Sequence, residues 1–152
     1  MKLSIILIII ISYIYICLIP SQIKAENRDD NKEIAVVVNP QNPIKHLTAR
    51  EVSDIFLSRR RTFPSGEPAL VLEQNLDGYL REKFFHLLNG MTLKRLNAYW
   101  VRLQFSGEVQ PPPVIADNIA MRNVVSNNRY AIGYMDYQYV DQSVSVILIL
   151  TD

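Results

Sequence analysis

The sequence has little cysteine, histidine and glycine, and these shortages exclude several classes of site. Its 152 residues include one cysteine, Cys17, two histidines and five glycines. A single thiol forms no internal disulfide framework and no cysteine-based metal site. His46 and His86 lie far apart in the sequence, without the spacing of a metal motif. We therefore expect neither a bound metal nor a cofactor.

The chain also lacks an excess of charge of either sign. Its 16 Lys and Arg residues nearly balance its 15 Asp and Glu residues. Two of the basic residues, Lys2 and Lys24, lie in residues 1–25, which contain no acidic residue. Residues 26–152 therefore carry a net charge near −1. Without a basic tail or a basic excess, nucleic acid is not an expected partner.

Catalytic motifs are missing as well. The sequence has no glycine-rich phosphate loop followed by Lys and Ser or Thr, and no nucleophile elbow. Neither histidine has an evident Ser or Cys to activate, and the carboxylates are scattered. We expect a protein that is not an enzyme.

One long hydrophobic run is present, and it lies at the N-terminus. Lys2 precedes an apolar segment, residues 3–18, and Ala25 ends a short polar stretch suited to signal peptidase. We expect a cleaved signal at 1–25, a flexible lead at 26–33 and one domain at 34–152. An uncleaved inner-membrane anchor is the alternative, because the run is also near the lower length limit of a spanning helix. Lipid attachment at Cys17 is less favoured, because no small residue precedes it.

The first part of the domain predicts a strand and a helix. Residues 34–38 form a continuous β-branched run, typical of a strand buried on both faces of a parallel sheet. Thr48 and Glu51 fit a capping box, which opens a short helix that ends near three arginines.

The remaining pattern predicts three more helices and three more strands. The apolar spacing places helices at 79–88, 92–105 and 117–128, and strands at 69–72, 130–134 and 144–150. Residues 111–113 are three consecutive prolines, which predict a polyproline II spacer. This order describes one α/β domain with a small sheet covered by helices.

Three of these segments carry a resemblance to a known family. Residues 34–40, 47–57 and 130–134 are similar to the periplasmic substrate-binding proteins of phosphate ABC transporters. The likeness is closer to short, single-lobe members, which share a helix and a turn where this sequence has Tyr99-Trp100 and Phe105-Ser106-Gly107. The resemblance implies a single lobe of the type 2 periplasmic binding protein fold, with a small mixed sheet flanked by helices. It also implies a periplasmic location and a non-catalytic role in holding phosphate or a related small oxyanion.

The ligand loop of that family is altered in this sequence. In the family, an Arg followed by Ser-Gly-Thr at a helix N-terminus supplies charge, hydroxyls and backbone N–H groups to the anion. Here residues 74–79 lack the Arg and the hydroxyls, and Asp77 would repel an anion. The candidate ligand-binding residues that remain are Asn75, Gly78, Tyr79 and Arg81.

A second interpretation is a single-lobe interaction or scaffold protein of a cell-envelope assembly that has lost ligand binding. A lone lobe supplies only one wall of a cleft, which favours a protein partner or a second copy of the chain. The candidate interaction surface consists of Arg59, Arg60, Arg61, Tyr134, Tyr137 and Tyr139. The arginine run also fits a solvated helix end, and the tyrosines also fit the border of a cleft at a strand end.

Overall fold

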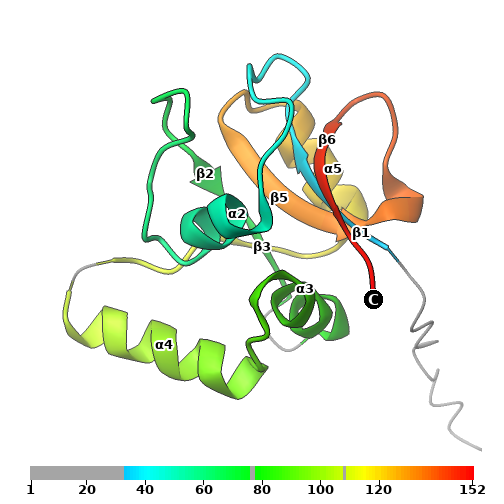
Figure 1. Ribbon diagram of the computed structural model, residues 1–152. Helices are drawn as coiled ribbons and strands as arrows, with labels where there is room; N and C mark the ends of the chain where they lie inside the picture. The colour runs from blue at the N-terminus through cyan, green and yellow to red at the C-terminus, as the bar shows by residue number, and fades with distance from the viewer. Residues whose placement is uncertain (1–32, 76–77, 108) are drawn as a thin grey trace, which may run out of the picture.

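The computed structural model describes residues 33–75, 78–107 and 109–152. The predicted signal, and the predicted lead apart from Glu33, lie outside the described residues. A four-stranded sheet forms the centre, in the order β2, β5, β1, β6 (Figure 1). Its strands are β1 (Ile34–Val38), β2 (Leu70–Val71), β5 (Ala131–Asp136) and β6 (Ser145–Leu150). Strands were predicted at each of these places.

The sheet is mixed, as the resemblance implied. β1 pairs antiparallel with both β5 and β6, whereas β2 pairs parallel with β5. Residues 34–38 were interpreted as a strand of a parallel sheet. That interpretation was wrong, because both neighbours of β1 run antiparallel to it. All five residues of β1 are buried, because both faces of the sheet are covered. A continuous apolar run reports burial on two faces and does not report the direction of the neighbouring strands.

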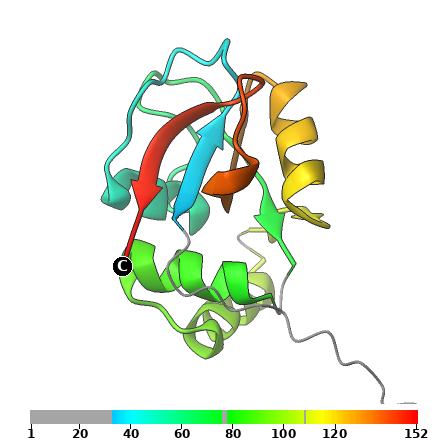
Figure 2. The same cartoon turned by 90° about the vertical axis from the view of Figure 1, so that its right-hand side faces the viewer.

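Helices cover the two faces of the sheet in separate layers. α2 (Ala49–Phe56) lies on one side and α5 (Asn118–Ser126) on the other (Figure 2). Ile34, Val36 and Val38 belong to the core cluster that contains residues of α2 and of α3 (Tyr79–Asn89). The alternate residues Ala35 and Val37 belong to the cluster on the α5 side. The period-two alternation of β1 thus supplies both halves of the core.

Local sequence determines how α2 begins. The Thr48 hydroxyl accepts from the Glu51 backbone N–H, while a Glu51 carboxylate oxygen accepts from the Thr48 backbone N–H at 2.9 Å. The predicted capping box is confirmed. Backbone and hydroxyl donors from Thr48 hold the pKa of Glu51 below its ordinary value of 4.5. The helix itself ends at Phe56, before the arginine run.

Aromatic packing joins α3 to the sheet. Phe84 of α3 stacks on Tyr134 of β5 with ring centroids 3.9 Å apart, and its edge meets Phe56 of α2. Phe85 is buried as well. α3 contacts the sheet, α2 and α4 (Leu93–Phe105), so more of its circumference is covered than one amphipathic stripe.

On the opposite face, a glycine allows α5 to approach the sheet. A Cβ added at Gly133 of β5 would collide with the sulfur of Met121 in α5. Met121 and Val125 are the buried residues of this helix. The absence of a side chain at Gly133 therefore sets how closely α5 packs.

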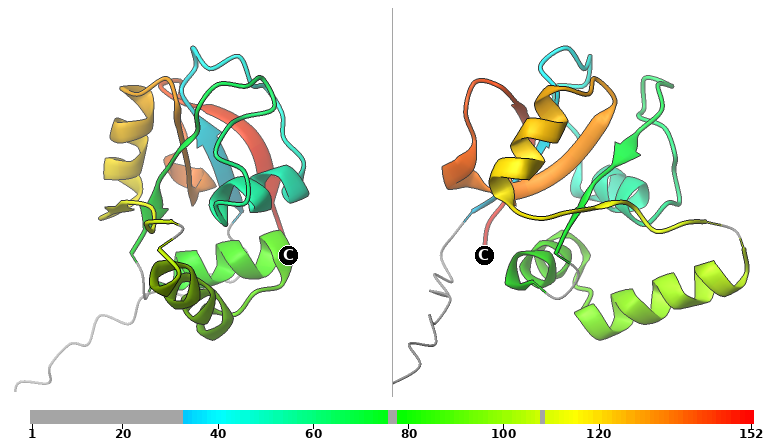
Figure 3. Two further views of the ribbon diagram at one scale, coloured as in Figure 1. Left: turned by 90° about the vertical axis from the view of Figure 1, so that its left-hand side faces the viewer. Right: turned by 180° about the vertical axis from the view of Figure 1, so that it is seen from behind.

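The predicted strand at 69–72 contains β2, and a second short strand that was not predicted follows it. β2 pairs with β5, and β3 (Glu73–Gln74) then pairs parallel with β4 (Val114–Ile115) in a separate two-stranded sheet. β4 follows the three prolines and was not predicted, because two residues carry no readable periodicity. Figure 3 shows the long connection that brings the chain back from α4 to this pair and to α5. Among the described residues, no helix has the length and apolar character of a membrane span.

Candidate functional site

Three of the predicted ligand residues lie together where α3 begins. Gly78 is the N-cap, with φ −79° and ψ 146°, and it has no side chain to cap the helix. Its backbone N–H donates to the Asn75 carbonyl at 3.0 Å. Tyr79 is the first helical residue. The structure therefore brings Asn75, Gly78 and Tyr79 to one end of α3, while Asp77 lies outside the described residues.

Arg81, the fourth predicted ligand, lies inside the protein. Its side chain is 2% exposed, and its Nε donates to Oε2 of Glu73 at 2.8 Å. One terminal nitrogen donates to Oδ1 of Asn97 at 3.1 Å. The guanidinium also lies over the ring of Phe85, 5.8 Å from its centroid. The charge of Arg81 is therefore balanced by Glu73 within the fold.

Glu73 is the residue that sequence analysis missed. It is 1% exposed, and its Oε2 accepts from both Arg81 and the Tyr134 hydroxyl, the latter at 3.2 Å. Its other oxygen, Oε1, is buried without a hydrogen-bond partner. Burial raises the pKa of Glu73, an effect that Arg81 and the Tyr134 hydroxyl partly oppose. Burial and the neighbouring Glu73 together raise the pKa of Tyr134 well above 10.0.

A cavity of about 300 Å³ lies beside this ion pair. It is formed where α4 and the proline segment approach the start of α3 and the β3 strand. Polar and apolar side chains share its wall, and the lining residues are Glu73, Arg81, Asn97, Trp100, Val101, Gln104, Pro111 and Pro112. The cavity thus combines one buried ion pair with two side-chain amides and an apolar wall.

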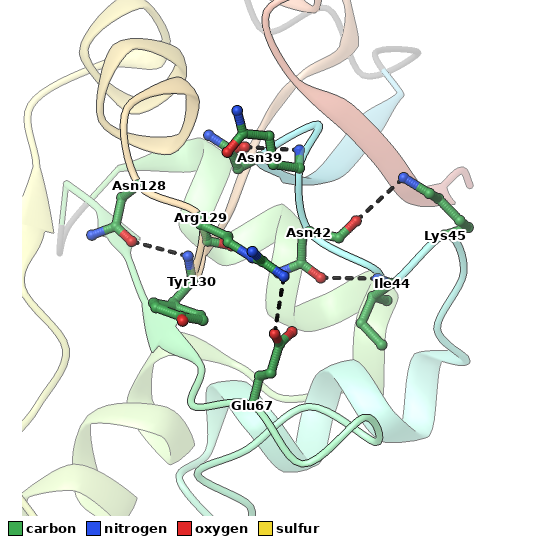
Figure 4. Close-up of polar contacts among 9 residues, drawn as sticks. Asn39, Asn42, Ile44, Lys45, Glu67, Asn128, Arg129 and Tyr130 are labelled. Atoms are coloured by element: carbon green, nitrogen blue, oxygen red, sulfur yellow. Dashed lines mark hydrogen bonds and ion pairs between the residues drawn. The ribbon is translucent and has the colours of Figure 1, made fainter.

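A second hollow, of about 530 Å³, lies at the carboxyl end of β1. Its lining includes Asn39 and Arg129, and Figure 4 shows the polar contacts around them. The Asn39 amide donates to the carbonyls of Val125 and Ser126 at the end of α5, at 3.1 and 2.6 Å.

Other polar side chains near that hollow also bind within the protein. The Asn42 amide donates to the Arg129 carbonyl at 3.0 Å, and the Arg129 guanidinium pairs with Glu67 at 3.2 Å. These side chains fasten the loops after β1 and α5 to one another. Their geometry explains local structure, and we assign no ligand to this hollow.

The predicted interaction surface is divided by the structure. Arg59, Arg60 and Arg61 are exposed beyond the end of α2, and Arg59 lies 3.5 Å from Asp54. Tyr137 and Tyr139 are 43% and 36% exposed on η1, the single turn Tyr137–Tyr139.

Tyr134 does not belong to that surface. It is 0% exposed and stacks in the core, so its assignment to an interaction surface was wrong. Its place in β5 directs its side chain toward α3, whereas the next two tyrosines follow the end of the strand.

The fold defines the class of protein to which the chain is similar. An ABC-type phosphate transport receptor from Vibrio cholerae matches with a TM-score of 0.60 and 22% identity over 76% of this chain. A protein from Clostridium perfringens, described as a phosphate ABC transporter substrate-binding protein and solved with bound phosphate, matches with a TM-score of 0.60 and 23% identity. PstS from Borrelia burgdorferi matches with a TM-score of 0.59 and 14% identity. No family model and no curated protein matches the chain.

These similarities concern the fold and only part of each neighbour. The chain covers 44%, 45% and 46% of the proteins from Clostridium perfringens, Vibrio cholerae and Borrelia burgdorferi, respectively. It has the architecture of a single lobe of the periplasmic binding protein fold, which confirms the predicted fold class. Within the described residues, no three His, Cys, Asp or Glu side chains are grouped so as to hold a metal ion.

Proposed function

We propose that this protein is an exported, non-catalytic binding lobe that holds phosphate or a related small oxyanion at the start of α3. The observation that carries the proposal is the N-terminus of this helix, which begins at a glycine without a side-chain cap. The first N–H groups of a helix lack partners within the helix, and its dipole favours negative charge there. Asn75 and Tyr79 flank this position.

The fold supports an anionic ligand, and the balance of charge near α3 determines how tightly we expect it to bind. Similar folds include a protein solved with bound phosphate. In this chain, however, Glu73 already balances the charge of Arg81. Most of the attraction then comes from backbone N–H groups, and we expect weak binding, with Kd on the order of 1 mM or somewhat tighter.

Calorimetric titration with phosphate tests the proposal, with two variants at one position. Gly78→Asp places a carboxylate on the helix N-terminus, where it caps the N–H groups and repels an anion. Gly78→Ala adds a Cβ without charge, at ordinary φ, 3.2 Å from the Asn75 carbonyl. We expect phosphate binding to be lost in Gly78→Asp and retained in Gly78→Ala. Equal binding by the two variants would place phosphate elsewhere.

A second candidate function is an interaction lobe of an envelope assembly or of a homo-oligomer. The supporting observation is the exposed apolar surface of α4, where Val101 is 49% and Phe105 is 89% exposed. Of the 13 residues of α4, only Leu96 and Trp100 are buried. Light scattering would show a mass above that of the monomer, which Phe105→Ser would reduce. A monomer for both proteins would exclude self-association through α4.

Export itself has a direct test. Intact mass measurement on protein expressed from the full-length sequence in an exporting bacterium should give a chain that begins at Glu26. A full-length mass in the membrane fraction would support the uncleaved anchor instead. The proposed location is the periplasm in the first case and the outer face of the inner membrane in the second.

A further inference from the structure

We propose that the cavity between α4, the proline segment and the Glu73–Arg81 pair is a second binding site, for a neutral, hydroxyl-rich small molecule of the monosaccharide class. The site lies apart from the proposed oxyanion position, because Asn75, Gly78 and Tyr79 are not among its lining residues. The inference therefore does not rest on phosphate binding.

The first argument is an unsatisfied acceptor. Glu73 is 1% exposed, and its Oε2 is bound by Arg81 and Tyr134. Its Oε1 is equally buried but has no hydrogen-bond partner. Buried polar atoms are nearly always paired, so an exception beside a cavity calls for an explanation. A ligand hydroxyl would satisfy this oxygen, with a small rearrangement of the wall.

The second argument concerns charge. Glu73 and Arg81 are the charged side chains among the described residues that line the cavity, and they neutralise one another. A phosphate entering here would meet the Glu73 carboxylate, and an organic cation would meet the Arg81 guanidinium. A neutral ligand avoids both repulsions. The charge distribution therefore selects against the ions that a single unpaired charge would attract.

The third argument concerns the rest of the wall. Asn97 and Gln104 are exposed amides, and each amide can donate and accept hydrogen bonds. Trp100, Pro111 and Pro112 supply apolar surface beside them. A pyranose ring presents hydroxyls around its edge and C–H groups on its faces, which matches this combination. A volume of about 300 Å³ is at the small end of ligand pockets and suits one ring.

Trp100 provides a local readout, because it is the only tryptophan of the chain. Protein expressed from the full-length sequence should be titrated with N-acetylglucosamine, with glucose and, in a separate arm, with phosphate. We expect saturable changes in Trp100 emission with the sugars and none with phosphate. A saturable change with phosphate alone would overturn the proposal. No change in emission with both sugars would also overturn it.

A pair of glutamine variants tests the position of the ligand. Gln104 lines the cavity, whereas Gln41 is another exposed glutamine, which lines the other hollow. Gln104→Ala should weaken sugar binding about fivefold, the usual effect of losing one hydrogen bond, and Gln41→Ala should leave it unchanged. Equal affinity in the two variants would overturn the assignment to this cavity.

Glu73→Gln separates the two proposed sites. The substitution removes the carboxylate that balances Arg81 and changes the acceptor offered to a hydroxyl. We expect weaker sugar binding, while phosphate binding is unchanged or stronger because net positive charge is left near α3. Unchanged sugar binding in a folded Glu73→Gln protein would contradict the role of Oε1. If this variant does not fold, the glutamine pair still decides the question.

Discussion

Two regions of the molecule have similar apolar sequence patterns but differ in how far their side chains are buried. One is the sheet with its covering helices, and the other is the α4 helix. All five residues of β1 are buried, and Phe84 and Phe85 of α3 are completely enclosed. α4 has its own apolar stripe, yet only Leu96 and Trp100 are buried, and Phe105 is 89% exposed. The comparison separates residues that hold the fold from residues that remain available to a ligand or partner.

The difference follows from how many neighbours each element has. α3 lies between the sheet, α2 and α4, whereas α4 contacts the rest of the domain mainly through α3 (Figure 3). The cavity beside Trp100 lies where this packing is incomplete. Substitutions in the two regions should therefore differ strongly in their effect on the free energy of unfolding.

The largest expected effect is in the aromatic core. Phe84→Ala removes the ring that stacks on Tyr134 and should lower the free energy of unfolding by about 3–5 kcal/mol. Urea denaturation followed by circular dichroism measures it. A loss below about 0.5 kcal/mol, the range of ordinary surface changes, would mean that this stack does not hold α3 to the sheet.

The second largest effect is expected when the buried ion pair is broken. Arg81→Gln should lower the free energy of unfolding by about 3 kcal/mol at neutral pH, because one buried charge is left unpaired. The pKa of Glu73 is raised in the fold, so its contribution to stability is complete below the unfolded pKa and is lost as pH rises through the folded pKa. The cost of Arg81→Gln should therefore shrink as pH falls toward 4.5, the ordinary value for Glu. The free energy of unfolding of both proteins should be measured by urea denaturation across this pH range. A difference between them that does not change with pH would contradict the assignment.

A smaller effect is expected at the start of α2. Thr48→Ala removes the capping hydroxyl and should lower the free energy of unfolding by about 1 kcal/mol. The pKa of Glu51 is lowered, so its contribution is present above the unfolded pKa and is lost as pH falls through the folded value. Thermal unfolding should show the difference between the wild type and the variant narrowing as pH falls below 4.5, while the part that comes from the Glu51 N–H bond to the Thr48 hydroxyl remains. Ser at position 48 should restore most of the difference.

The smallest effect is expected on α4. Phe105→Ser should change the free energy of unfolding by less than about 0.5 kcal/mol, because the ring is already exposed. The same urea measurement as for Phe84→Ala makes the contrast direct. A loss comparable with that of Phe84→Ala would show that α4 is covered in solution, as the interaction lobe requires.

The elements found from sequence are those with local or periodic signals. The Thr48 capping box needs only four residues, and β5, β6 and the long helices carry clear apolar patterns. β3 and β4 were missed because each has two residues and their pairing joins segments far apart in the chain. The direction of the neighbours of β1 was wrong for the same reason, since pairing is not encoded within one strand.

The candidate site was less accessible than the fold. The start of α3 was located correctly from its apolar spacing, but the Glu73–Arg81 pair depends on two elements folding against one another. A glutamate directly after an apolar stretch, eight positions before an arginine, was the available signal. Tyr134 was misplaced because its neighbours Tyr137 and Tyr139 are exposed, whereas α3 covers its own position in β5.

The central claim is that the start of α3, where Gly78 is the N-cap, holds an oxyanion, and calorimetric titration with phosphate tests it most directly. We predict a saturable heat with the wild-type protein and with Gly78→Ala, and its loss in Gly78→Asp. No heat and no thermal shift for the wild type at millimolar phosphate would contradict the claim and leave the interaction lobe as the better account of this fold.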